Sequence, residues 1–117
     1  MKVLVCGGRD YANREAVFNR LDLLLAEHPR LELTIIHGGA SGADALAKEW
    51  AAMREVDQIE FRADWKRFGK AAGPYRNRLM LDKGKPDLVI AFPGGDGTKN
   101  MVGQAMLAGV ECHVLSK

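Results

Sequence analysis

The sequence predicts an α/β fold, a three-layer sandwich in which helices cover both faces of a five-stranded parallel sheet. Short apolar runs typical of strands alternate along the chain with longer segments whose apolar residues recur at helical spacing. Glycine-rich breaks separate the strongest of these runs from the helices that follow them. Strands that alternate with helices form right-handed crossovers and parallel sheets, and we expect the strand order 3-2-1-4-5.

Five segments are expected to form the strands. Three strongly apolar runs, each followed by a glycine-rich break, cover residues 3–6, 33–36 and 88–92. Two weaker segments, residues 58–62 and 111–115, complete the sheet.

Four segments are expected to form the helices that cross between these strands. Helical spacing of apolar residues, or a proline suited to a first helical turn, identifies residues 17–25, 46–53, 74–83 and 101–108. His28-Pro29 ends the first helix, and Gly109 is a C-terminal stop for the last one.

Length and composition indicate one globular domain over residues 1–117, with 47% hydrophobic and 27% charged residues. The net charge of +2 is too small for a dedicated nucleic-acid-binding protein, so nucleic acid is an unlikely partner. Because no apolar run approaches the ~18 residues of a membrane span, we expect a cytoplasmic protein without a membrane partner. Cys6 and Cys112 have no disulfide or metal spacing, and we expect two free, buried thiols and neither metal nor cofactor.

Three glycine-rich segments, residues 7–11, 38–44 and 93–98, each connect a strand to a helix. In a parallel sheet these segments leave the same edge, so they are expected to face one another at the switch point of the strand order. Glycine permits close backbone approach, and helix N-termini offer unpaired N–H groups. Glycine is also what tight turns require, but three such loops together favour a site for a phosphate or another anion.

The residues expected to bind the ligand lie in these loops, in the connection between residues 62 and 74, or near the start of the expected helix 74–83. They are Gly7, Gly8, Arg9, Asp10, Gly38, Gly39, Ala40, Ser41, Gly42, Asp44, Asp64, Arg76, Asn77, Pro93, Gly94, Gly95, Gly97 and Thr98. An arginine of this set suits a phosphate, and an aspartate suits a sugar hydroxyl. Ser41 and Thr98 are also natural helix N-caps, and capping alone is the favoured interpretation for both.

Trp65 has two interpretations, stacking on a base or anchoring the long connection between residues 62 and 74. The basic residues between positions 66 and 78 are equally consistent with a solvated surface segment.

Four sequence patterns together resemble one known family. The motifs GGRDY, HGGASGAD, ADW with GPYRNR, and PGGDGT occur in order along essentially the whole chain, whereas the P-loop and G-x-G-x-x-G motifs are absent. The chain thereby resembles the SLOG superfamily, which includes the LOG phosphoribohydrolases and the DNA-processing protein DprA, and above all its YspA-like branch from phage and bacterial genomes. This resemblance implies a Rossmann-like fold and a nucleotide or nucleotide-derived ligand at the glycine-rich loops.

One departure from the LOG pattern bears on catalysis. The LOG enzymes carry PGGxGTxxE, whereas Met101 occupies the position of the glutamate in this chain. A carboxylate can stabilise or attack the oxocarbenium-like state of glycosidic cleavage, but a thioether cannot. Met101 is therefore interpreted as a core residue.

Three functions remain open from the sequence. The first is a nucleotide-binding module, for example a sensor or pathway component in a phage or bacterium. The second is a phosphoribohydrolase-like enzyme acting on a nucleoside 5′-monophosphate through Asp10, Asp44, Asp64 or Asp96. The third is single-stranded DNA binding as in DprA. Fold analogy does not choose among them, although loss of the glutamate favours the first. A homo-oligomer is also expected, as in related SLOG proteins.

Overall fold

A computed structural model of the chain describes residues 1–116, so the predicted domain ends one residue beyond the described range. The five strands are β1 (Lys2–Cys6), β2 (Thr34–His37), β3 (Asp57–Glu60), β4 (Leu88–Ala91) and β5 (Glu111–Val114). They form one sheet in the order β3-β2-β1-β4-β5, and every neighbouring pair is parallel. The predicted fold class and strand order are confirmed.

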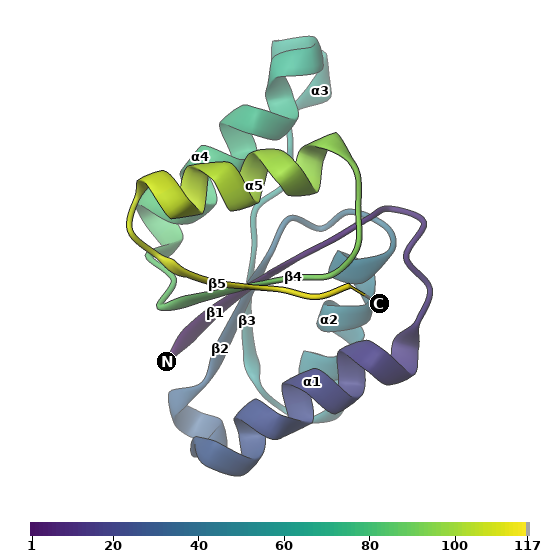
Figure 1. Cartoon of the computed structure of the whole chain (residues 1–117), viewed down its shortest axis with the longest axis vertical. Helices are drawn as coiled ribbons and strands as arrows, with labels where there is room; N and C mark the ends of the chain where they lie inside the picture. Colours follow the sequence, from purple (N-terminus) through teal and green to yellow (C-terminus); the bar gives the residue numbers. More distant parts are fainter. Residues whose placement is uncertain (117) are drawn as a thin grey trace.

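Helices cover both faces of the sheet, as Figure 1 shows. Helices α1 (Arg14–Glu27) and α2 (Ala43–Met53) lie on one face, and α4 (Ala72–Gly84) and α5 (Asp96–Leu107) lie on the other. The central strand β1 supplies both cores, because Val3 and Val5 pack toward α1 and α2 whereas Leu4 and Cys6 pack toward α4 and α5. Burial on both faces explains why β1 is a continuous apolar run.

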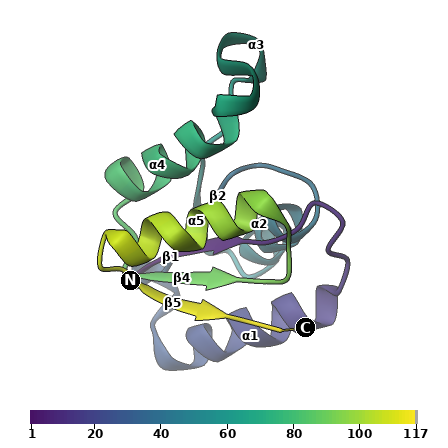
Figure 2. The same ribbon diagram turned by 45° about the horizontal axis from the view of Figure 1, so that its top comes forward.

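The connection from β3 to α4 differs from the prediction. Two short helices, α3 (Trp65–Phe68) and η2 (Gly69–Ala71), fill a segment that the sequence analysis treats only as a long connection. Asp64 caps α3 by accepting a hydrogen bond from the backbone N–H of Arg67 at 3.1 Å. Figure 2 shows α3 projecting away from the sheet beyond the start of α4.

Helix α4 begins at Ala72, two residues before the predicted start at Pro74. A proline is compatible with this position, because the first N–H groups of a helix have no intrahelical partner.

The two cysteines are free, as predicted, but only Cys6 is buried as expected, whereas Cys112 on the edge strand is partly exposed. Cys6 ends β1 and Cys112 lies on β5, with β4 between them. Within residues 1–116, no helix has the length and apolar character that crossing a membrane requires.

Candidate functional site

The three glycine-rich loops meet at the carboxyl edge of the sheet, where the loop after β1 lies between the other two. The backbone N–H of Gly8 donates to the carbonyl oxygen of Pro93 at 2.8 Å, and the Gly8 carbonyl accepts from the N–H of Ala43 at 3.2 Å. These hydrogen bonds join segments that are about 35 to 85 residues apart in sequence. The expectation that the loops face one another is therefore confirmed.

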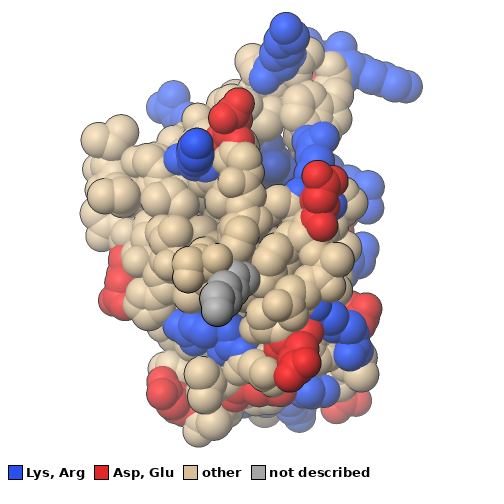
Figure 3. Space-filling view, turned by 45° about the vertical axis from the view of Figure 1, so that its right-hand side comes forward, with Lys and Arg blue, Asp and Glu red and all other residues tan. Residues whose placement is uncertain are grey.

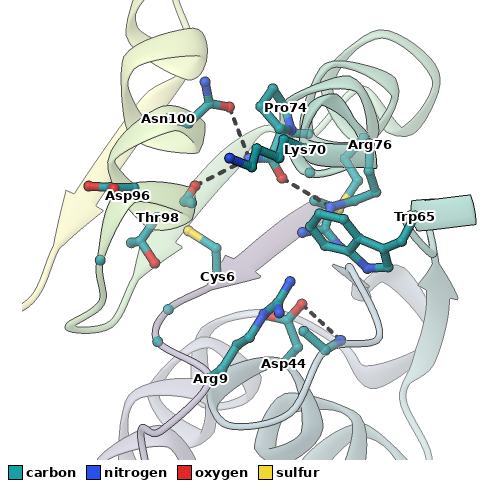
Figure 4. Close-up of a pocket in the computed structure, with 18 residues that line it drawn as sticks. Cys6, Arg9, Asp44, Trp65, Lys70, Pro74, Arg76, Asp96, Thr98 and Asn100 are labelled. Carbon is teal, nitrogen blue, oxygen red and sulfur yellow. Dashed lines mark hydrogen bonds between the residues drawn. The ribbon is translucent and has the colours of Figure 1, made fainter. Parts of the chain in front are cut away.

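A cavity of about 560 Å³ opens beside these loops, which is within the usual range for small-molecule sites. Figure 4 shows its walls coming from several elements. The lining residues are Cys6, Gly7, Gly8, Arg9, Ala40, Asp44, Trp65, Lys70, Gly73, Pro74, Arg76, Asn77, Met80, Gly95, Asp96, Gly97, Thr98 and Asn100. A smaller cavity of about 210 Å³ adjoins it and is lined in part by Gly38 and Ser41.

The structure brings most of the predicted residues to these two cavities, but not all of them. The predicted residues that line neither cavity are Asp10, Gly39, Gly42, Asp64, Pro93 and Gly94. Of the four candidate catalytic carboxylates, only Asp44 and Asp96 line the larger cavity. Asp64 is engaged as the cap of α3.

Asp44 is a buried carboxylate in the first turn of α2. Its Oδ2 atom accepts hydrogen bonds from the backbone N–H groups of Gly38 at 2.9 Å and Ala40 at 3.5 Å, which ties the loop after β2 to the helix. Burial raises the pKa of Asp44, and the nearby guanidinium of Arg76 opposes this increase. These two hydrogen bonds use Oδ2 alone, so Oδ1 can accept a further donor.

We expect Asp44→Asn to change how stability depends on pH. Because burial raises the pKa of Asp44 above its unfolded value of 3.8, the folded state binds more protons than the unfolded state just above that pH. The free energy of unfolding of the unmodified protein therefore falls as the pH rises through this window, and the asparagine variant lacks that contribution.

Urea titrations between pH 3.5 and pH 7 measure this difference. Asp44→Ala is the control, because it removes both acceptors and leaves the Gly38 N–H unpaired, at a cost of about 1–3 kcal/mol. An identical pH dependence in the unmodified and Asp44→Asn proteins would contradict the raised pKa.

Arg76 and Asn77 join α4 to two of the glycine-rich loops. Arg76 Nη1 donates to the carbonyl oxygen of Gly38 at 2.9 Å, and a Cβ atom at Gly38 would lie only 2.1 Å from Nη1. Arg76 Nε donates to Asn77 Oδ1 at 3.0 Å. The buried Asn77 amide donates to the Gly97 carbonyl oxygen at 3.2 Å and to Asn100 Oδ1 at 3.1 Å. Asn77 thus positions Arg76 relative to the start of α5, with its own polar atoms engaged.

Three cationic side chains, Arg9, Lys70 and Arg76, line the larger cavity. Within the described part of the chain, none of them forms an ion pair with a carboxylate. Burial lowers the pKa of Arg76; the carboxylate of Asp44 opposes this decrease, and the charge of Arg9 adds to it. The carboxylates of Asp44 and Asp96 also line the cavity, but the three cations outnumber them, and this excess of positive charge suits an anion.

Trp65 lies at the rim of this cavity, 47% exposed. The guanidinium of Arg9 lies 5.0 Å from the centre of the indole ring, within the range of a cation–π interaction. Figure 4 shows the ring beside both Arg9 and Arg76. Lys66, Arg67 and Lys70 continue the positive charge onto the projecting α3 and η2, where Lys and Arg side chains gather in Figure 3.

The favoured interpretation of Ser41 and Thr98 as helix caps is wrong. Gly42 and Gly95 occupy the N-cap positions of α2 and α5, and neither cap has a side-chain hydrogen bond. Ser41 Oγ instead donates to the Arg9 carbonyl oxygen at 3.1 Å. Thr98 lies within the first turn of α5 and lines the larger cavity.

Several lining residues were not among the predicted site residues, namely Cys6, Trp65, Lys70, Gly73, Pro74, Met80 and Asn100. The place of Asn100 in the site could have been predicted, because it follows Asp96 by four residues and therefore lies on the same helix face. No sequence pattern marked Cys6 as a site residue, because an apolar run predicts only a buried thiol. Burial raises the pKa of the Cys6 thiol to about 12.

Met101 is fully buried in the core between the sheet and helices α4 and α5. It does not line the cavity, so the interpretation of Met101 as a core residue is confirmed.

The fold and the site define a Rossmann-like α/β protein whose glycine-rich loops border a cavity lined by cations. The chain belongs to the SLOG proteins, because the model of the YspA, cpYpsA-related SLOG family (YAcAr) matches residues 1–68. The match ends before Arg76 and before the PGGDGT loop.

Two known proteins are similar to this chain. The Gene 61 protein of Mycobacterium phage D29 is 39% identical over 116 residues, which cover 93% of this chain and 91% of that protein. The X-ray structure of DNA processing protein A (DprA) from Streptococcus pneumoniae matches with a TM-score of 0.80 at 20% identity. That match covers 99% of this chain but only 50% of the DprA chain, so the two proteins share a fold over half the length of DprA.

Proposed function

We propose that this chain, as one domain, binds a nucleotide or a nucleotide-derived ligand in the larger cavity and acts as a sensor or pathway component. The observation that carries this proposal is the set of three cations, Arg9, Lys70 and Arg76, that line one cavity and form no ion pair among the described residues. A phosphate group would accept charge-assisted hydrogen bonds from these cations. The predicted homo-oligomer stays a prediction.

The start of α5 is the proposed phosphate position. Its N-cap has no side-chain hydrogen bond, and the first N–H groups of a helix carry partial positive charge. Gly95 and Gly97 line the cavity there, and a Cβ atom at either position would meet no atom within 4 Å. The backbone at Gly95 and Gly97 is therefore open to a ligand on the side where a Cβ atom would lie.

Asp44 and Trp65 suit the remaining parts of a nucleotide. Asp44 Oδ1 can accept a hydrogen bond from a ribose hydroxyl, because the backbone N–H groups engage Oδ2. The exposed indole of Trp65 offers a surface for stacking on a base. LOG-type catalysis is not part of the proposal, because Met101 is buried away from the cavity. An enzymatic role would have to use Asp44 or Asp96.

A second candidate ligand is single-stranded DNA. The basic residues Lys66, Arg67 and Lys70 project beside the cavity on α3 and η2, and the fold is shared with a DNA processing protein. A DNA ligand would show an affinity that falls steeply with salt concentration.

Thermal unfolding in the presence of candidate ligands tests the proposal. We expect one nucleoside phosphate, at 100 times its Kd, to stabilise the protein by about 2.7 kcal/mol. For a chain of this size that corresponds to a rise in Tm of about 10 °C. The panel contains nucleoside mono-, di- and triphosphates, NAD, ADP-ribose and oligothymidine, each at two salt concentrations.

Gly95→Val should abolish the shift, because its side chain enters the cavity at the proposed phosphate position. The matched control is Gly103→Val on the same helix, which also meets no atom within 4 Å but lines neither cavity. No shift with any nucleotide, or an equal shift in Gly95→Val, would overturn the proposed site. A shift with oligothymidine alone would favour the second candidate.

A further inference from the structure

The larger cavity continues into the smaller one across a shared wall. Four residues, Arg9, Ala40, Trp65 and Arg76, line both cavities. The smaller cavity holds about 210 Å³, which is below the usual range for a separate small-molecule site. It therefore extends the larger cavity of about 560 Å³ rather than forming an independent site.

The shared wall is cationic, and neither of its arginines forms an ion pair among the described residues. Arg9 is held over the Trp65 ring, and Arg76 is held against the loop after β2 by its hydrogen bond to the Gly38 carbonyl oxygen. Both guanidinium groups thus lie where the two cavities meet. This pair of guanidinium groups suits one bridging anionic group, because the hydrogen bonds of Arg76 use its Nε and Nη1 atoms and leave Nη2 as a donor to a phosphate oxygen.

The smaller cavity itself suits a polar, uncharged group. Its residues outside the shared wall are Gly38, Ser41 and Ala63, which add a hydroxyl and backbone groups but no charged side chain. A sugar, which presents hydroxyl groups and no charge, matches this lining.

We propose that the physiological ligand has two parts, a nucleoside phosphate in the larger cavity and a second sugar in the smaller one, joined by a phosphate between Arg9 and Arg76. The ligand class is therefore a nucleoside diphosphate sugar or a dinucleotide rather than a mononucleotide. This inference rests on the proposed function and adds the chemical class of the ligand.

Isothermal titration calorimetry on the full chain tests the inference with paired probes that share a base. The pairs are AMP with ADP-ribose, GMP with GDP-mannose, UMP with UDP-glucose, and CMP with CDP-glucose. For the preferred base we expect the two-part probe to bind about tenfold more tightly than the monophosphate, a difference of about 1.4 kcal/mol.

Ala63→Phe should remove this preference, because the phenyl group occupies the smaller cavity and leaves the larger one unchanged. Its affinity for the monophosphate should stay within about twofold of the unmodified protein. Ser41→Tyr fills the same cavity from a second, exposed position, in case Ala63→Phe lowers the Tm of the free protein. Ala52→Phe, at an exposed position of α2 that lines neither cavity, should keep the preference.

Two results would overturn the inference while leaving the proposed function intact. One is equal or weaker binding of every two-part probe relative to its monophosphate. The other is a preference that persists in both Ala63→Phe and Ser41→Tyr. Binding of none of the eight probes would overturn the proposed function and the inference together.

Discussion

Replacing Gly42 with alanine is expected to lower the free energy of unfolding by roughly 3 kcal/mol or more. Gly42 has a φ of +78°, a conformation that costs energy for residues with a side chain. A Cβ atom there would lie 2.0 Å from the Gly8 carbonyl oxygen and 2.7 Å from the carbonyl carbon of Arg9. Both contacts are with backbone, so the loop after β1 has to move. The movement would break the hydrogen bond between Gly8 and Ala43.

Gly109→Ala is the matched control for this experiment. Gly109 has a φ of +75°, but a Cβ atom there would meet nothing within 4 Å. The control therefore costs only the conformational penalty, about 1–2 kcal/mol. Urea unfolding followed by circular dichroism measures both losses. Equal losses in the two variants would mean that the close approach of the glycine-rich loops contributes nothing to stability.

The sheet was predictable from sequence because a strand that is buried on both faces is a nearly continuous run of apolar residues. The apolar runs that became β1, β2 and β4 are central strands, whose two faces both meet helices. The edge strands β3 and β5 contain no buried residue and carry weaker signals, yet the alternation of strands and helices still placed them. The three loops followed from the topology alone, since parallel strands end at a common edge.

The side chains of the candidate site were less predictable, because their roles depend on contacts between distant segments. An aspartate in the first turn of a helix can complement the helix dipole or hold a neighbouring loop, and the sequence looks the same in both cases. The hydrogen bonds that Asp44 accepts from the backbone N–H groups of Gly38 and Ala40 show that it holds the loop. Asn77 was expected to contact the ligand, but its amide is engaged by Arg76, Gly97 and Asn100. No local pattern encodes a network that joins two helices.

Glycines in the loops also divide into two groups that the sequence does not distinguish. Gly39 looked like a ligand-contacting residue, but it lines neither cavity, and a Cβ atom there would meet the Glu60 side chain at 2.9 Å. A substitution at Gly39 therefore reports on the fold, whereas Gly95 faces open space in the larger cavity and reports on the ligand. Only the packing around each backbone position separates these roles.

Met101→Glu restores the LOG pattern in sequence but is expected to destabilise the protein by roughly 3–5 kcal/mol at pH 7 without adding hydrolase activity. Met101 is fully buried among apolar residues and lies outside the cavity. A carboxylate at this position cannot reach a ligand, and its burial disfavours the charged form. Met101→Leu keeps the volume and should cost less than about 1.5 kcal/mol, whereas Met101→Ala should cost about 2–5 kcal/mol.

The pH dependence of Met101→Glu distinguishes a buried charge from a simple packing defect. Burial raises the pKa of the introduced carboxyl above its usual value of about 4.3, so above that pH the folded state retains a proton that the unfolded state has released. Stability relative to the unmodified protein therefore falls as the pH rises from 4 to 7. Met101→Gln has a similar shape without the titrating group, and its loss should be independent of pH. Hydrolysis of a nucleoside 5′-monophosphate by Met101→Glu, absent from Met101→Gln, would contradict this account. It would show that this face of α5 reaches the ligand.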